Sequence, residues 1–443
     1  MDYSPQSKKK IKLLLKPLQP FRYLEFLIVL PITFFYLLFW KTYLLFFGHL
    51  NKTAGQKRIL YIQPASISAL KKKGNFYLAS EKDLDGFFDF TMVNYRSSGK
   101  RQTYRPRENY IINDSPSKIY LFPGVYTFLL FHYFCQQIYK NKINIIHITS
   151  PFYLGIVGLV CSRVFKIPIT LSIHAPYDQY VEKRGRGDIA HLNLPLIEYF
   201  FQWIVFKNTD TVMTIDPYYK EYIEKKVGFN HQINFIPHGI DTNWWGQVSD
   251  NDVKEKLGLE GKKMIVLVCR IAEDKEIRLV PEIARIVLKE HPDAVFVWAG
   301  GGDYEDKIKK ILSDLSISDK FYFLGFQDKE KVKSLRYAAD INLCVWDGFS
   351  QLEAMISGRP VVCGYNYFHS IKNEVNGICV DDWQKDYKSY ARAINFLLDN
   401  PEKGDEFGKS ARDEVMAKYS LKYTNEIKKN LYLKIFDKNY GKK

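Results

Sequence analysis

The sequence predicts an α/β protein built from two doubly wound units that follow an apolar N-terminal segment. From residue 58 onward, short apolar runs alternate with longer stretches of helical periodicity, which is typical of parallel sheets covered by helices. The alternation breaks near residues 237–241 (PHGID) and then restarts. Because ligands of such sheets bind at the carboxyl ends of the strands, we expect the two units to face a common cleft.

Four segments follow from this pattern: a basic and apolar membrane-associated segment (1–57), two Rossmann-like units (58–240 and 241–404) and C-terminal helices (405–443) expected to pack back on the first unit. Strands are expected at 59–62, 88–93, 143–148, 169–173, 211–215 and 233–236, and then at 264–269, 294–299, 321–324, 341–345 and 361–363. Helices are expected at 153–165, 280–289, 304–314 and 352–357.

Composition and charge exclude several classes of protein. Hydrophobic residues make up 46% and charged residues 26% of the chain, so it is neither disordered nor fibrous. The formal net charge is +15, and residues 1–58 hold ten Lys or Arg residues against two acidic ones. This clustering favours an anionic membrane surface over nucleic acid as partner. None of the six cysteines forms a CxxC pair, so we expect buried free thiols and no zinc site.

Residues 26–47 are almost wholly apolar, interrupted by Pro31, Thr33, Lys41 and Thr42. As a helix this segment is about 33 Å long, enough to cross a bilayer core. No small-residue cleavage site follows, which disfavours a signal peptide. The upstream lysines would keep the N-terminus cytoplasmic, so a single span would place the rest of the chain outside. Re-entrant or in-plane attachment is therefore favoured over a true span, and burial against the protein's own core is the third alternative.

The most specific segment is 347–362, DGFSQLEAMISGRPVV. A buried strand ends in a glycine-containing loop, and a helix begins at about Ser350. The N-terminus of that helix offers backbone N–H groups to a phosphate, and Glu353 is placed to bind ribose hydroxyls. Alternatively, Ser350 and Glu353 form a capping box that satisfies the helix end without any ligand. The spacing alone leaves both interpretations open.

Weaker candidates lie at other strand ends. Arg270 and Lys275 follow a strand, and their cations suit a leaving diphosphate, although a solvated pair fits the spacing as well. His147 and His174 also stand at strands, where a lone histidine is most often structural. The Asp-x-Asp pattern at 83–85, which could hold a divalent metal, precedes a glycine instead of ending an apolar strand, so we expect no metal site there.

The segment 353–362, EAMISGRPVV, resembles the nucleotide-binding signature of the retaining group 1 (family 4) glycosyltransferases of the GT-B fold. The resemblance implies two Rossmann-like domains facing a cleft, with Glu353 on the donor ribose. It also implies donor contacts from the loop that holds Asp347, Gly348, Phe349 and Ser350. Asp347 and Glu353 are separated by five residues where the family has seven, so this chain departs from the pattern at Asp347.

The same resemblance assigns roles to residues outside this segment. It implies that Arg270 and Lys275 neutralise the leaving diphosphate, with Cys269 and Glu276 standing where the family has glycines. It places Gly301 in the family's Gly-x-Gly turn and Phe326 beside the nucleobase. It has His174 face the donor sugar. The PHGID segment at 237–241 resembles the interdomain linker, with His238 in place of Asn.

The function implied is hexosyl transfer from a nucleotide-diphosphate sugar, with retention of configuration and without a required metal or other cofactor. The C-terminal unit is expected to take the donor and the N-terminal unit a lipid-linked or envelope-polysaccharide acceptor, at the cytoplasmic side of a membrane. A non-catalytic membrane-anchored scaffold or nucleotide-sugar sensor with the same fold is the alternative. Nucleic acid is not expected as a partner.

Overall fold

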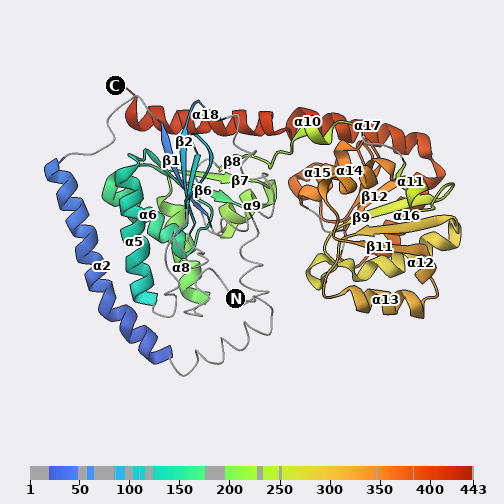
Figure 1. Ribbon diagram of the computed structural model, residues 1–443, viewed down its shortest axis with the longest axis horizontal. Coiled ribbons are helices and arrows are strands. Elements are labelled where there is room, and N and C mark those ends of the chain that lie inside the picture. Colours follow the sequence, from blue (N-terminus) through green and yellow to red (C-terminus); the bar gives the residue numbers. More distant parts are fainter. Residues whose placement is uncertain are drawn as a thin grey trace. The chain divides into compact units, whose positions relative to one another are not determined.

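The structure is a computed structural model that describes residues 19–47, 57–63, 84, 86–94, 103–108, 110–114, 123–174, 195–226, 233–248, 252–345, 348–382 and 384–441. The chain forms two compact units (Figure 1). The N-terminal unit comprises Met1–Ile236 together with Glu426–Lys443, and the C-terminal unit comprises Pro237–Asn425. Each unit is described by itself.

The N-terminal unit is built on an eight-stranded sheet of order β3-β4-β2-β1-β5-β6-β7-β8. All neighbouring strands are parallel except β3, which runs antiparallel to β4. The strands are β1 (Arg58–Gln63), β2 (Asp89–Asn94), β3 (Thr103–Arg107), β4 (Tyr110–Asp114), β5 (Ile145–Ile148), β6 (Ile169–Ile173), β7 (Thr211–Thr214) and β8 (Ile233–Phe235). The central strands β5 and β6 are buried along their whole length, as is typical of strands inside a parallel sheet.

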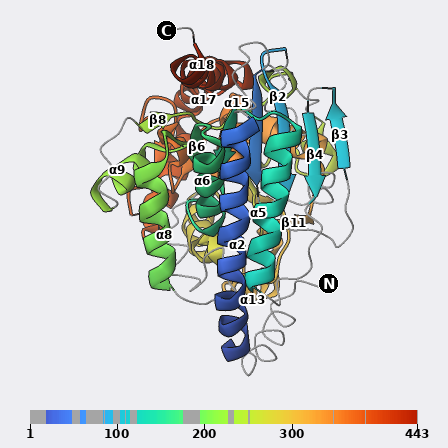
Figure 2. The ribbon, with the colours of Figure 1, turned by 90° about the vertical axis from the view of Figure 1, so that its left-hand side faces the viewer.

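Helices cover both faces of this sheet. On one side lie α5 (Pro123–Lys140), α6 (Tyr153–Phe165) and α8 (Pro195–Asn208), with α2 (Gln19–Phe47) outside α5 (Figure 2). A short helix, α9 (Pro217–Lys226), follows β7. The end of α18 (Leu421–Tyr440) completes a core with residues of β1, β2 and β5, because Tyr432, Ile435 and Phe436 are buried against them.

The C-terminal unit contains a six-stranded, fully parallel sheet of order β11-β10-β9-β12-β13-β14. Its strands are β9 (Lys263–Val268), β10 (Ala294–Ala299), β11 (Phe321–Gly325), β12 (Ile341–Cys344), β13 (Val361–Cys363) and β14 (Ile378–Cys379). Its helices are α10 (Thr242–Trp245), α11 (Val253–Lys256), α12 (Val280–Glu290), α13 (Glu305–Asp314), α14 (Lys329–Ala338), α15 (Phe349–Ile356), α16 (Tyr387–Asp399), α17 (Pro401–Lys418) and the first residues of α18.

The predicted fold class is confirmed, with differences in detail. The sequence predicted only parallel strands, but β3 is an antiparallel edge strand, and the β3–β4 hairpin, α5 and β14 were not predicted. The chain divides after Ile236 instead of at residue 240. Of the C-terminal stretch expected to pack on the first unit, only Glu426–Lys443 belongs to that unit. The six cysteines are free thiols.

Candidate functional site

The candidate site lies at the carboxyl edge of the C-terminal sheet. Strand β9 stands between β10 and β12, so the chain leaves β9 toward one side of the sheet and returns through β12 on the other. Such a reversal of strand order opens a crevice at the carboxyl ends of the two strands. Arg270 follows β9 and helix α15 follows β12. The topology therefore brings the two predicted phosphate-binding elements to one crevice.

Arg270 and Lys275 occupy the loop after β9. Arg270 is exposed, and Lys275 is half-buried in a 3₁₀ turn, Glu273–Lys275. Glu276 has a φ of +51°, in the left-handed region that glycine adopts most easily. This explains why the related signature carries glycine at that position. Both cations therefore lie just beyond the carboxyl end of β9.

The three glycines after β10, Gly300, Gly301 and Gly302, allow their loop to approach the backbone of the Arg270 loop closely. Gly300 has a φ of +147°, and a Cβ atom there would lie 1.9 Å from the carbonyl oxygen of Cys269. The indole Nε1 of Trp298 donates to that same oxygen at 3.3 Å. The backbone N–H of Ile271 donates to the carbonyl of Gly301 at 3.2 Å. The glycines thus position the Arg270 loop.

Phe326, predicted beside the nucleobase, lies after β11 and is 76% exposed. Its ring is 3.3 Å from the position that a Cβ atom on Gly301 would take. The two predicted residues are therefore adjacent. An exposed aromatic ring at this edge of the sheet offers a flat apolar surface on which a base can stack.

Helix α15 begins without a side-chain cap. Its N-cap residue is Gly348, and no side chain accepts a capping hydrogen bond there. Ser350 lies inside the helix, and its hydroxyl donates to the carbonyl of Val268 at 2.8 Å. The capping-box alternative is therefore wrong. Glu353 is half-buried on the same helix, and Asp347 lies outside the described residues.

A buried arginine that the sequence did not reveal supports this helix end. Arg336 of α14 is fully buried and donates to Asn342 Oδ1 at 3.0 Å and to the carbonyl of Ser350 at 3.1 Å. It also donates to the Ser350 hydroxyl. Within the described part of the chain, no carboxylate forms an ion pair with this guanidinium, and its Nε has no partner. A fixed positive charge therefore lies beneath the first turn of α15, where the helix dipole already favours an anion.

In the N-terminal unit, His147 is a structural residue. It is buried, with Nδ1 2.8 Å from the Tyr432 hydroxyl and Nε2 2.8 Å from Ser172 Oγ. Tyr61 stacks on its ring at 4.3 Å and lies 2.8 Å, oxygen to oxygen, from Tyr432. Burial holds the pKa of His147 well below its ordinary value. All polar atoms of the ring are engaged within the core.

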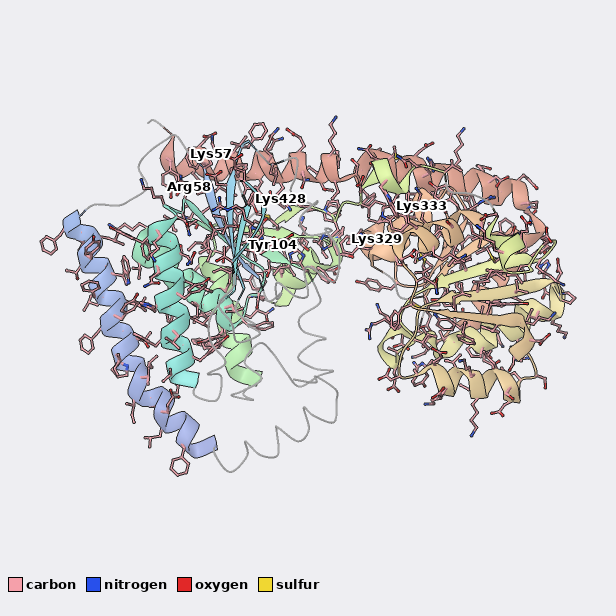
Figure 3. All side chains as sticks on the ribbon, viewed as in Figure 1. Lys57, Arg58, Tyr104, Lys329, Lys333 and Lys428 are labelled. Atoms are coloured by element: carbon pink, nitrogen blue, oxygen red, sulfur yellow. The ribbon has the colours of Figure 1, made fainter. Side chains whose placement is uncertain are left out.

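His174 stands at the end of β6 and is half-buried. Burial, together with the positive charge of Lys428, lowers its pKa to about 4. Lys428 is carried by α18 (Figure 3). At neutral pH the imidazole is therefore uncharged, so that one ring nitrogen donates a hydrogen bond and the other accepts one.

The lowered pKa of His174 predicts a pH effect on stability. Between about pH 4 and 6.5 this histidine binds a proton in the unfolded chain but not in the folded chain. The free energy of unfolding therefore falls as the pH drops through this window. His174→Gln should reduce the loss of stability between pH 7 and pH 5 by about 1 kcal/mol, allowing for solvent screening. Melting temperatures at the two pH values measure the difference. Above pH 7 the melting temperatures of the two proteins should differ by a constant amount. If both proteins lose the same stability between pH 7 and pH 5, the pKa of His174 is not lowered by folding.

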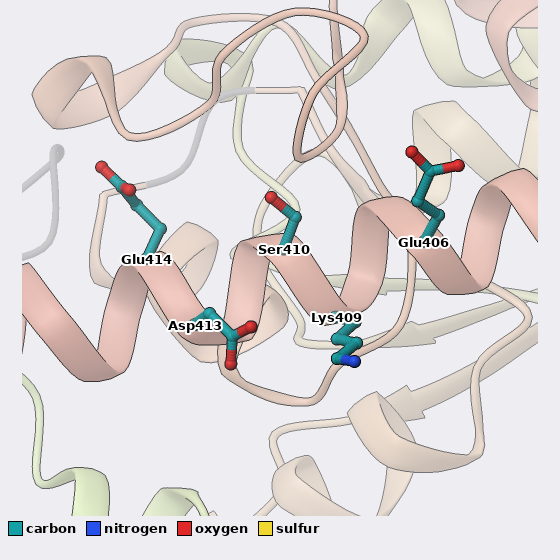
Figure 4. Close-up of a pocket in the computed structure, with 5 residues that line it drawn as sticks. All are labelled: Glu406, Lys409, Ser410, Asp413 and Glu414. Atoms are coloured by element: carbon teal, nitrogen blue, oxygen red, sulfur yellow. The ribbon is translucent and has the colours of Figure 1, made fainter.

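A surface hollow on α17 carries none of the predicted residues. It is lined by Glu406, Lys409, Ser410, Asp413 and Glu414 (Figure 4). Glu406, Ser410 and Glu414 point to one side of the helix, and Lys409 and Asp413 point to the other. Glu414 is paired with Lys372 and Lys418. The side chains do not converge, so this hollow is ordinary charged surface.

Comparison with known proteins agrees with this geometry. Residues 249–414 match the family model of group 1 glycosyl transferases, and residues 89–244 match that of glycosyltransferase family 4. The chain is 28% identical over 241 residues to alpha-monoglucosyldiacylglycerol synthase of Streptococcus pneumoniae, a match that covers 51% of this chain and 53% of that protein. It therefore spans about half the length of that relative.

Two solved structures share the fold over most of the chain. Sucrose-phosphate synthase from Thermosynechococcus elongatus superimposes with a TM-score of 0.69 at 19% identity, covering 86% of this chain and all of that one. HepE of Anabaena in complex with UDP superimposes with a TM-score of 0.65 at 14% identity, covering 85% and 99% of the two chains. The two family models together cover both units, and the chain belongs to the group 1 glycosyltransferases of the GT-B fold.

Proposed function

We propose that this protein transfers a hexose, with retention of configuration, from a nucleotide-diphosphate sugar to a lipid-linked or envelope-polysaccharide acceptor at a membrane, with the catalytic units on its cytoplasmic side. The observation that carries the proposal is that α15 begins against the end of β9, where the Ser350 hydroxyl donates to the carbonyl of Val268 at 2.8 Å. There, an uncapped helix N-terminus with a buried arginine beneath it faces the loop of Arg270 and Lys275. Three sources of positive charge at one sheet edge suit a diphosphate.

In the proposed reaction, the C-terminal unit binds the donor. The first-turn N–H groups of α15 bind the diphosphate, Glu353 accepts hydrogen bonds from the ribose hydroxyls, and Phe326 stacks on the base. As the bond between the sugar and the diphosphate breaks, Arg270 and Lys275 neutralise the charge that develops on the leaving group, so that no metal is required. His174, uncharged at neutral pH, contacts the donor sugar. The acceptor oxygen bonds to the sugar on the face that the diphosphate leaves, and the proton of the acceptor hydroxyl passes to the departing phosphate oxygen.

The acceptor part of the proposal rests on different support. The relative from Streptococcus pneumoniae is named for the synthesis of a glucosylated diacylglycerol. The chain also carries one described helix, Leu24–Phe46 within α2, that is long and apolar enough to cross a membrane. Basic residues precede this helix in the sequence. A lipid-borne acceptor and a membrane-held enzyme agree with both observations.

Ligand-induced thermal shifts test the donor site. UDP, GDP, ADP and CMP are each added with magnesium or with EDTA, and inorganic pyrophosphate is tested in parallel. We expect one nucleoside diphosphate, in EDTA, to stabilise the protein by about 2.7 kcal/mol at 100 times its Kd. Glu353→Gln should diminish the rise in melting temperature caused by the nucleotide and leave the rise caused by pyrophosphate intact. The reason is that Glu353 is proposed to bind the ribose hydroxyls, which pyrophosphate lacks.

The matched control is Glu402→Gln, which changes an exposed carboxylate in the first turn of α17. It should leave both shifts unchanged. If no nucleotide shifts the melting temperature, the donor site is overturned and the non-catalytic scaffold becomes the better assignment. A shift that appears with magnesium but not with EDTA would overturn the metal-independent part alone.

A further inference from the structure

Helix α2 lies against the N-terminal unit along its length. It has 29 residues, so it is about 43 Å long. Figures 1 and 2 both show it running beside α5 on the outside of the helical layer. Its contact side includes Thr33 and Leu44, which are 2% and 1% exposed. One side of the helix is thus packed on protein from its first half to its last turn.

Three polar side chains of α2 point toward the protein. The carboxylate of Glu25 accepts hydrogen bonds from the backbone N–H groups of Gly124 (2.8 Å) and Val125 (2.6 Å), and so caps the N-terminus of α5. The Tyr36 hydroxyl lies 3.0 Å from His132 Nδ1, and the Tyr43 hydroxyl lies 3.1 Å from that of Tyr139. Each of these partners belongs to α5.

The opposite side of α2, called here the outer face, is apolar. Its large hydrophobic side chains are each between 45% and 80% exposed: Phe21, Leu24, Leu27, Ile28, Leu30, Ile32, Phe34, Phe35, Leu38, Phe39, Leu45 and Phe46. Among the described side chains of this face, Lys41 alone carries a charge. A surface helix in water has the reverse arrangement, with its apolar stripe inward and its polar groups outward.

The outer face therefore needs an apolar environment, either a second copy of the chain or lipid. The charges of the neighbouring residues distinguish between these two. In the sequence, basic residues precede this face at Lys8, Lys9, Lys10, Lys12 and Lys16 and follow it at Lys52. If two copies paired through this face, either parallel or antiparallel, basic ends would meet basic ends. An anionic lipid surface attracts both ends and also covers the apolar side chains.

We propose that the outer face of α2 seats the N-terminal unit on one leaflet of an anionic bilayer, with the helix axis in the plane of the membrane. A span would require lipid on every side of α2. A span would break the hydrogen bonds that Glu25 and the two tyrosines make to α5, and it would leave these polar groups without partners in hydrocarbon. This inference deepens the membrane attachment in the proposed function by assigning the surface and its orientation.

Helix α8 adds to the same helical layer. Its exposed Phe200 and Trp203 stack at 6.3 Å between ring centroids and are 57% and 49% exposed. Lys207, one turn further, is also exposed. Aromatic rings beside a lysine are typical of protein surfaces that lie at the lipid headgroups.

Vesicle flotation of the full chain tests the proposal. The protein should float with phosphatidylcholine vesicles that contain phosphatidylglycerol, and more weakly without it. The triple variant Leu27→Glu, Phe35→Glu, Phe46→Glu should lower the floated fraction at least tenfold. These side chains are 62%, 66% and 80% exposed, so the fold does not depend on them. The control Val248→Glu changes a residue that is 76% exposed in the C-terminal unit and should leave flotation unchanged.

Orientation needs a second measurement. Cysteines introduced at Ser4 and Lys52, on either side of α2, are probed with a membrane-impermeant maleimide in sealed vesicles. Labelling of both from the same side is the expected result, and labelling from opposite sides overturns the in-plane arrangement. If the triple variant floats as well as the unchanged protein, the outer face does not bind lipid. The assignment also fails if the unchanged protein is a dimer and the triple variant is a monomer. The nucleotide shift of the triple variant should stay normal, so failure here is distinct from failure of the donor site.

Discussion

Replacing Arg270 by alanine should lower kcat/KM for sugar transfer by about 10²- to 10³-fold, the loss typical of removing one fixed charge from a developing anion. The backbone that carries this side chain is positioned at the carboxyl end of β9 by the close approach of the Gly300 loop. Because the charge on the diphosphate grows as the sugar leaves, the loss should fall mainly on kcat. Steady-state kinetics with the donor identified by thermal shift measures both parameters.

Arg278→Ala is the matched control for Arg270→Ala. Arg278 is also an exposed arginine in the same segment, and its guanidinium lies 3.0 Å from Glu276. Its removal should change kcat/KM by less than about threefold. Arg270→Lys should fall between the two, because a lysine restores the charge without the planar fork. Equal effects at Arg270 and Arg278 would show that Arg270 has no special role.

Gly300→Ala should lower the melting temperature of the C-terminal unit by about 10 °C, since a hard steric overlap costs about 3 kcal/mol or more. The added Cβ would lie 1.9 Å from the Cys269 carbonyl oxygen, and both partners are backbone, so no side chain can rotate away. The φ of +147° adds strain for any residue with a Cβ. Separating the two loops also displaces Arg270, so the nucleotide-induced shift should shrink.

Gly258→Ala isolates the effect of steric overlap from that of backbone strain. Gly258 also has a positive φ, +64°, but a Cβ atom there would meet nothing within 4 Å. It should therefore cost only the strain of a left-handed residue, about 1 kcal/mol, and should leave nucleotide binding unchanged. Similar losses in the two variants would mean that the Gly300 loop is free to move away from Cys269. Differential scanning fluorimetry gives the melting temperature of each of the two variants, with and without nucleotide.

The sequence predicted the parts of the fold that local patterns encode. Strands β9, β10 and β12 are mostly apolar runs bounded by loops, and they were expected within one residue of their observed limits. The edge hairpin β3–β4 was missed because its strands, TYRPR and YIIND, are polar or contain proline and do not alternate. An edge strand is half solvated, so its sequence carries little of the signal that marks a buried one.

The candidate site shows the same division. Arg270, Lys275 and Glu353 were predicted from motifs next to strands, and the structure places the elements that carry them at the same edge of the sheet. Arg336 could not be found, because its segment KEKVKSLRYA resembles an exposed charged helix. Its burial depends on acceptors at Asn342 and Ser350, which only the folded chain brings together. The same holds for α2, whose apolar composition was evident but whose inward-facing polar groups required the partner helix.

The route of α18 has a consequence for how the protein is made. Residues Glu426–Lys443 belong to the N-terminal unit, and Tyr432 supplies the hydroxyl that contacts both His147 and Tyr61 in its core. On the ribosome, residues 237–425 are complete before this segment emerges. The unit whose synthesis starts first is therefore the last to be finished. Throughout that interval α2 has already been synthesised, so its exposed apolar side chains are present in the nascent chain before the N-terminal unit has closed its own core.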